Sequence, residues 1–428
     1  MRIRSTLLVL LLAGLGPTAR ADVVNSWVAS RGVDGPGQVC GYGDAACNRC
    51  VEDVPGQVRA LESFSDAWND QPLTGRFRVE MQVGERLGAY DPIVGINRSR
   101  HIQGLARVPG VGDEDWLVLT RATGSSDGWA GFITMRLEDF DGRGGRAFFH
   151  SPDIHTYDAP APAERSFRRF VQMPGTNHAS GIQMLGRTLV VGAACEDGAP
   201  GCPVVPGGKA WVELWDLADP VNPSMPTRFA APPESSGHYA AATRLRNGST
   251  LVLLNAQDAG WFDLFVAPEA TLGAETEWVY LGGADFGDLD PEWHDGDDRL
   301  IDNHAYQNAS LVTECGSGDL YLVTLRQVGD GGVDTWDNWN ELELFRLDLR
   351  VRPDQLFTRR GAVTSRDPFE GDIALSYEEG FDFREQSGCL MRGGSSVHVT
   401  PDGRMVLYCG PKEGEGDGQI TLGEIRMP

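Results

Sequence analysis

The sequence has few positive charges, few histidines and no long apolar run after its first residues. Its 428 residues include 37 Lys or Arg against 61 Asp or Glu, which gives a net charge of −24. This balance argues against nucleic acid and anionic membranes as partners, because both repel a negative protein. No later segment predicts a membrane span. The H-E-x-x-H, P-loop and Rossmann G-x-G-x-x-G patterns are also missing, so zincin and nucleotide-binding functions gain no support.

The first residues have the pattern of a secretory signal. Arg2 and Arg4 precede the apolar run 7–12, and Ala19-Arg20-Ala21 is a typical cleavage site. An uncleaved anchor helix is the alternative, which the early Gly and Pro residues disfavour. We therefore expect a secreted or periplasmic protein. The expected organisation is a signal peptide at 1–21, a Cys-containing extension at 22–74 and one β-propeller domain at 75–428.

Eight cysteines in an exported chain predict disulfides. Two local pairs are expected across short loops, and in the N-terminal cluster two cysteines are expected to pair while the third reaches a distant partner. Since the sequence holds one CxxC and no His after it, a Cys₄ zinc site and covalent haem attachment are excluded. The candidates are Cys195 with Cys202, Cys389 with Cys409, and Cys40, Cys47, Cys50 and Cys315.

Five segments repeat one plan, in which a polar entry precedes a strand, a tight turn and a second apolar strand. Asn-Gly and Asp-Gly turns within these segments are strong hairpin signals. The segments begin at His101, His178, His238, His304 and Arg392. Third strands are expected at 131–137, 211–217, 261–267, 341–349 and 419–426, and fourth strands at 146–150, 225–230, 276–283 and 355–363.

The fifth repeat ends on its third strand, so a closed ring needs a fourth strand from elsewhere. The early run 76–87 is the natural donor, because such a closure removes open sheet edges. These repeats predict an all-β, five-bladed β-propeller closed by an N-terminal strand. Six blades and paired β-sandwiches are the alternatives.

Two short motifs support this architecture. Residues 211–223 (WVELWDLADPVNP) resemble the strand and turn of bacterial secreted β-propeller repeats, and Val399–Arg404 (VTPDGR) resembles a common propeller hairpin. The resemblance implies architecture and no particular enzyme family.

Four of the eight histidines stand at or near the same point of successive repeats. In a propeller these strand starts meet at one mouth of the axial channel. A ring of imidazoles there predicts a transition-metal site for Zn, Fe or Cu, with His101, His178, His238 and His304 as ligands. The pattern is similar in architecture to the four-His iron centre of carotenoid-cleaving oxygenases, which have seven blades. Metal-free acid/base function and plain structural hydrogen bonding stay open as alternatives.

Further residues near these strand starts complete the candidate site. The expected catalytic residues are His178, His238, Arg392 and Tyr306, and the expected substrate-binding residues are Arg98, Arg100, Gln307 and Asn177. Arginine at the rim suits a carboxylate or phosphate. The acidic loop 288–298 is a candidate Ca²⁺ site, with a solvated loop as the alternative.

These features predict an exported propeller with a His-lined axial site. It would be a metal-dependent lyase, hydrolase or oxygenase acting on an anionic or glycan-like small substrate, or a non-catalytic propeller that binds a ligand or partner protein. The sequence leaves open whether the protein is an enzyme.

Overall fold

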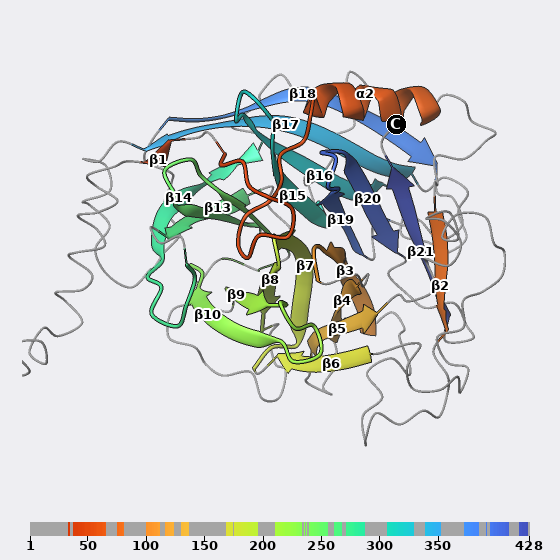
Figure 1. The fold of residues 1–428 in the computed structure, drawn as a ribbon, viewed down its shortest axis with the longest axis vertical. Helices are drawn as coiled ribbons and strands as arrows, with labels where there is room; N and C mark the ends of the chain where they lie inside the picture. Colours follow the sequence, from red (N-terminus) through yellow and green to blue (C-terminus); the bar gives the residue numbers. More distant parts are fainter. Residues whose placement is uncertain are drawn as a thin grey trace, which may run out of the picture.

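The protein is built mainly of β-strands arranged in four-stranded units (Figure 1). The structure, a computed structural model, describes residues 33–34, 37–65, 75–80, 100–111, 116–123, 130–136, 168–173, 175–195, 210–232, 235, 237, 239–255, 261–267, 271–286, 306–328, 339–351, 372–384, 391, 394–410 and 419–426.

Five units follow one another along the chain, and each is an antiparallel sheet whose strands pair in sequence order. Unit 1 contains β3 (Arg100–Val108), β4 (Trp116–Thr123), β5 (Ala130–Arg136) and β6 (Arg168–Met173). Unit 2 contains β7 (His178–Leu185), β8 (Thr188–Ala194), β9 (Ala210–Asp216) and β10 (Ser224–Ala230). Unit 3 contains β11 (Tyr239–Arg244), β12 (Thr250–Asn255), β13 (Trp261–Ala267) and β14 (Val279–Asp285). A parallel bridge between Tyr239 and Gly181 joins units 2 and 3 into one curled eight-stranded sheet.

Unit 4 contains β15 (Asn308–Thr313), β16 (Leu320–Val328), β17 (Trp339–Val351) and β18 (Asp372–Arg384). Unit 5 contains β19 (Gly394–Val399), β20 (Met405–Gly410) and β21 (Gln419–Arg426), and its fourth strand is β2 (Gly75–Glu80). β2 pairs antiparallel with β21 from Gly75–Glu424 to Glu80–Gln419. The early run therefore supplies the outer strand of the last unit, as the sequence predicts.

The first strands of the units lie side by side around one axis. β3 contacts β7, β7 contacts β11, β11 contacts β15, β15 contacts β19, and β19 contacts β3. This spacing depends on small residues. A Cβ on Gly104 would lie 2.7 Å from Ile182 Cγ1, and one on Gly394 would lie 3.0 Å from the Gly104 carbonyl carbon. The arrangement is propeller-like.

The apolar core lies between neighbouring units. Trp116, Phe132 and Trp211 belong to one buried cluster shared by units 1 and 2, while Leu264, Leu311 and Phe345 belong to another shared by units 3 and 4. Buried side chains of this size each stabilise the fold by about 2–3 kcal/mol. Packing between sheets therefore holds the units together.

Two fourth strands differ from the sequence-based expectation. The expected segments 146–150 and 355–363 lie outside the described residues. The outer positions of units 1 and 4 belong instead to β6, which pairs with β5, and β18, which pairs with β17. An outer strand pairs on one side only, so its hydrophobic pattern is weakly constrained. Neither strand follows its partner after a short turn, so the turn residues that mark the other hairpins in the sequence provide no signal here.

The segment before β2 crosses the molecule and ends in a helix. β1 (Val33–Asp34) pairs with the far end of β17, and α2 (Val54–Ser65) packs on β18 (Figure 1). Val54 and Val58 of the helix are fully buried. In the described part of the chain, no helix has the length and apolar character needed to cross a membrane.

Candidate functional site at the start of the first strands

His178 stands at the first position of β7, where the sequence predicts a site. Its side chain is 3% exposed, and Nε2 lies 3.1 Å from Nε2 of Gln103 on β3. Asn308, the first residue of β15, donates through Nδ2 to the Gln103 carbonyl at 3.2 Å. Three first strands thus bring an imidazole and two amides together at this end of the axis.

Backbone contacts hold His178 in place. Thr176 Oγ1 accepts from the His178 N–H at 3.0 Å and donates to the Ala194 carbonyl at 2.5 Å. The amide nitrogen of Gln103 is a donor, so Nε2 of His178 accepts in this contact when the imidazole carries its proton on Nδ1.

Two buried oxygen atoms next to this cluster make no hydrogen bond within the described residues. They are Asn308 Oδ1 on β15 and Ser395 Oγ on β19, and both side chains are fully buried. A Cβ on Gly181 would lie 2.3 Å from Asn308 Oδ1, so β7 approaches this amide closely. Unpaired buried acceptors are rare and costly, which is a common feature of binding sites.

The structure describes the other predicted site residues unevenly. Asn177 is buried beside His178, and Gln307 is half-buried beside Asn308. Tyr306 is fully buried, its ring packs on Phe286, and its hydroxyl donates to the Glu343 carboxylate. For Arg100 and His101 only the backbone is described, in β3. Arg98, His238, His304, Arg392 and the acidic loop 288–298 lie outside the described residues.

The described residues contain no group of three or more metal-ligating side chains. His178 is the one predicted metal ligand whose side chain is described, and its Nε2 faces an amide nitrogen, which does not bind metals. The four-His metal site thus stays a prediction.

Buried carboxylates on the third strands are a feature that the sequence analysis missed. Glu213 of β9 accepts from the indole nitrogens of Trp211 at 2.9 Å and Trp215 at 3.0 Å. Asp263 of β13 accepts from Trp261 at 3.0 Å and from Tyr280 at 2.9 Å. Glu343 of unit 4 and Glu424 of unit 5 accept from Tyr306 and Tyr408 in the same way.

The sequence carried a signal for these carboxylates, in Trp211-x-Glu213 and Trp261-x-Asp263. Residues two apart on a strand point to the same face, which lets the indole reach the carboxylate. Burial raises the pKa of Glu213, while its bonds to Trp211 and Trp215 and the charge of Arg228 oppose that rise. Their repetition in four units points to a role in joining strands.

The opposite end of the first strands is covered by the N-terminal segment 37–57, here called the cover segment. It contacts the hairpin between the first and second strands of every unit. A Cβ on Gly43 would lie 3.0 Å from Gly110 Cα in unit 1, so the two backbones touch. The hydrogen bonds are Arg187 N to Asp44 O (3.1 Å), Gln38 N to Arg244 O (2.8 Å), Gly37 N to Gly318 O (2.7 Å) and Glu52 N to Gly403 O (3.1 Å).

Disulfides fix the cover segment. Cys40 pairs with Cys47 inside it, and Cys50 pairs with Cys315 on the hairpin of unit 4. Cys195 and Cys409 are also disulfide-bonded. Their expected partners, Cys202 and Cys389, lie outside the described residues. Figure 1 shows the red cover segment crossing the centre of the molecule over the first strands.

Comparisons with known proteins assign no family to the chain. No protein-family model matches it, and no curated protein matches its sequence. Among solved structures, a family 117 glycoside hydrolase of the marine bacterium Zobellia galactanivorans is similar at 10% identity and a TM-score of 0.35, over 83% of this chain and 92% of that chain.

Two further solved structures illustrate the range of the matches. A putative hydrolase of Bacteroides ovatus is 10% identical with a TM-score of 0.32, over 76% of this chain and 85% of that chain. A mutant of the Synechocystis apocarotenoid oxygenase is 12% identical with a TM-score of 0.28, over 68% of each chain. These values assign neither a family nor an activity to this chain.

Proposed function

We propose that the protein is an exported, closed five-bladed β-propeller with one functional site, at the mouth formed by the starts of its first strands. Two observations support the blade count: the five first strands contact one another in cyclic order, and β2 completes the last unit. The signal-like N-terminus and the disulfides support export to the periplasm or the exterior.

The contrast between the two ends of the axis carries the proposal. The hairpin end is covered by a segment that contacts all five units and is tied to unit 4 by the Cys50–Cys315 disulfide. The start end holds His178 and Gln103 together with the unpaired Asn308 Oδ1. In this proposal the ligand therefore binds at the start end.

The ligand class follows from the residue types at this mouth. Amides and an imidazole exchange hydrogen bonds with hydroxyl groups, and the unpaired Asn308 Oδ1 is an acceptor for a ligand hydroxyl. Arg98 and Arg392 precede first strands in the sequence and Arg100 begins β3, and their guanidinium groups would bind an anionic substituent. An acidic saccharide satisfies both requirements.

In the enzymatic form of this proposal His178 is the general base. Its neutral imidazole takes a proton at Nε2 once a substrate hydroxyl replaces the Gln103 contact, and Gln103 and Asn308 orient the substrate. The products would be those of a hydrolase or lyase.

A metal centre is a separate part of the proposal. His101, His178, His238 and His304 would hold Zn, Fe or Cu, which would activate water or oxygen at the mouth. Binding through His178 Nε2 requires Gln103 to turn away. Elemental analysis after reconstitution tests this part. Less than a tenth of an equivalent of transition metal would rule out the metal centre and leave the proposed ligand site standing.

A non-catalytic propeller that binds a saccharide or a partner protein is the second candidate. The full burial of Asn308 and Ser395 favours it, because a site this enclosed admits little more than one group of a ligand without rearrangement.

A panel of acidic and neutral oligosaccharides separates these candidates. Binding by calorimetry and product formation are measured for the wild type, His178→Ala and the matched control His398→Gln. We expect binding of an acidic member, with a loss of at least about tenfold in affinity and loss of any turnover in His178→Ala. Binding without turnover supports the second candidate, and equal binding by His178→Ala contradicts the site.

A further inference from the structure

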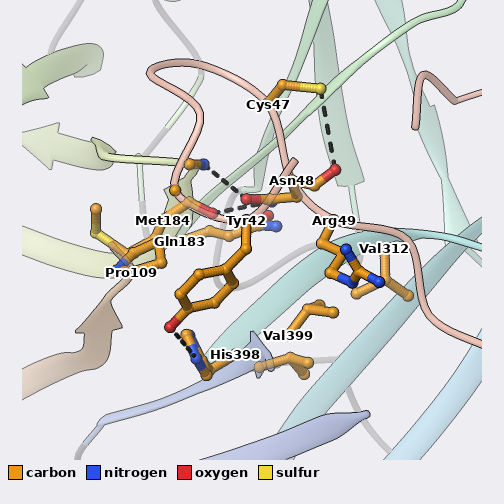
Figure 2. Close-up of a pocket in the computed structure, with 13 residues that line it drawn as sticks. Tyr42, Cys47, Asn48, Arg49, Pro109, Gln183, Met184, Val312, His398 and Val399 are labelled. Carbon is orange, nitrogen blue, oxygen red and sulfur yellow. Dashed lines mark hydrogen bonds between the residues drawn. The ribbon is translucent and has the colours of Figure 1, made fainter. Parts of the chain in front are cut away.

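A second pocket lies at the covered end of the axis, between the cover segment and the ends of the first strands (Figure 2). Its enclosed volume is about 20 Å³, and it opens to solvent. Tyr42 and Arg49 come from the cover segment, Met184 lies at the end of β7, and Val312 and His398 belong to β15 and β19. With Pro109, which follows β3, five separate parts of the chain build it.

The amide side chains of the pocket already have partners. Asn48 donates to the Met184 carbonyl at 3.0 Å and accepts from the Gly186 N–H at 2.6 Å. Gln183 donates to the Leu311 carbonyl at 2.8 Å and accepts from the N–H groups of Ala242 and Leu311. These amides hold the walls and have little capacity left for a ligand.

Arg49 is different, because it makes no hydrogen bond or ion pair with any residue that the structure describes. Its side chain is half-buried, and its Nε atom is fully buried without an acceptor. None of the thirteen lining residues is an Asp or Glu. In a chain of net charge −24, a guanidinium that pairs with no carboxylate of the described residues is a candidate anion receptor.

His398 and Tyr42 are polar neighbours of Arg49 in the pocket. Burial, and then the charges of Arg107 and Arg426, lower the pKa of His398 well below its usual value, so this imidazole is neutral at pH 7. His398 Nε2 lies 3.4 Å from the Tyr42 hydroxyl. Both groups are polar neighbours that do not repel an anion beside Arg49.

The walls select among anions. Val312, Val399 and Met184 are apolar, and Figure 2 shows the Arg49 side chain extending beside Val312 above Val399. A phosphate or sulfate needs donors on most of its oxygens, whereas a carboxylate needs one guanidinium fork and tolerates apolar contact on its carbon side.

We propose that this pocket binds a small carboxylate, with both oxygens on the guanidinium of Arg49 and the carbon body against the valines. The site is separate from the mouth at the strand starts and does not depend on the function proposed there.

Acetate and acetamide form a matched pair of probes, because they differ in charge and hardly in shape. Binding to the full-length protein is measured by calorimetry and by the NMR shift of the His398 imidazole. We expect saturable acetate binding in the millimolar range and much weaker binding of acetamide and inorganic phosphate. Equal binding of acetamide or phosphate would overturn the proposal.

Variants test the role of Arg49. Arg49→Gln should weaken acetate binding by at least about tenfold, and Arg49→Lys, which keeps the charge and loses the fork, should be intermediate. Arg59→Gln is the control, since Arg59 is exposed on α2 and contacts Glu379 at 3.5 Å. Unchanged acetate affinity in folded Arg49→Gln or Arg49→Lys protein would contradict the proposal.

Discussion

At the scale of single residues, His178 and His398 have opposite surroundings although both are buried in first strands. His178 lies at the start of β7 against Gln103, and His398 lies near the end of β19 beneath Tyr42. The repeat alignment could predict the position of His178, because strand starts are marked by the hairpins that follow them. It could not predict the Gln103 contact, which depends on the axial packing of β3 against β7.

His398 makes stability depend on pH. Its pKa is lowered in the folded state, first by burial and then by Arg107 and Arg426. Below pH 6.5 the imidazole of His398 binds a proton in the unfolded chain but not in the folded chain, so stability falls as the pH falls. Tyr42 and Tyr408 are the other groups facing the ring.

We expect His398→Gln to remove this dependence. Between pH 7.5 and 5.5 the wild type should lose about 1 kcal/mol more than the variant, measured by urea unfolding at each pH. Tyr42→Phe, which keeps the imidazole, should retain the wild-type slope. Identical slopes in wild type and His398→Gln would show that His398 does not titrate abnormally.

At the scale of elements, the inner and third strands followed from the sequence, and so did the outer strands of units 2, 3 and 5. The outer strands of units 1 and 4 did not. β13 and β21 have the predicted bounds, because both neighbours constrain an interior strand. The cover segment was not predicted as a cover. It is held to the hairpins by backbone hydrogen bonds, which require no periodic pattern of hydrophobic residues in the sequence. Only its cysteines indicated that it is attached to a distant part of the chain.

Gly186 is where the cover segment meets the hairpin of unit 2. Its φ is 58°, and a Cβ there would lie 1.8 Å from the Asp44 carbonyl oxygen. Gly248 has the equivalent place in unit 3 with a φ of 90°, and nothing lies within 4 Å of its Cβ position. Both glycines have a positive φ, and they differ in that only Gly186 is in contact with the cover segment.

Replacing each glycine by alanine isolates that contact. Gly248→Ala should cost about 1 kcal/mol for the left-handed backbone. We expect Gly186→Ala to cost at least about 1 kcal/mol more and to speed proteolysis within residues 38–48, because the segment must move away. Equal stability and equal cleavage in the two variants would mean that the cover segment is not seated on this turn.

At the scale of the whole molecule, the two ends of the axis are unequal. The hairpin end is covered by the segment 37–57 from before the first unit, with the small Arg49 pocket beneath it. At the start end, His178, Gln103 and Asn308 come together from three first strands. The meeting of all five strand starts at one mouth stays a prediction of the repeat. The covering of the hairpin end came from tertiary contacts that a sequence pattern does not encode.

Hydrogen–deuterium exchange with and without the tightest-binding oligosaccharide of the panel tests the central claim most directly, since it locates the bound ligand. The account predicts protection at the strand starts, residues 100–104, 176–180 and 306–310, with unchanged exchange at the hairpins 185–188 and 400–404. Protection confined to the hairpins or to the outer strands would contradict it.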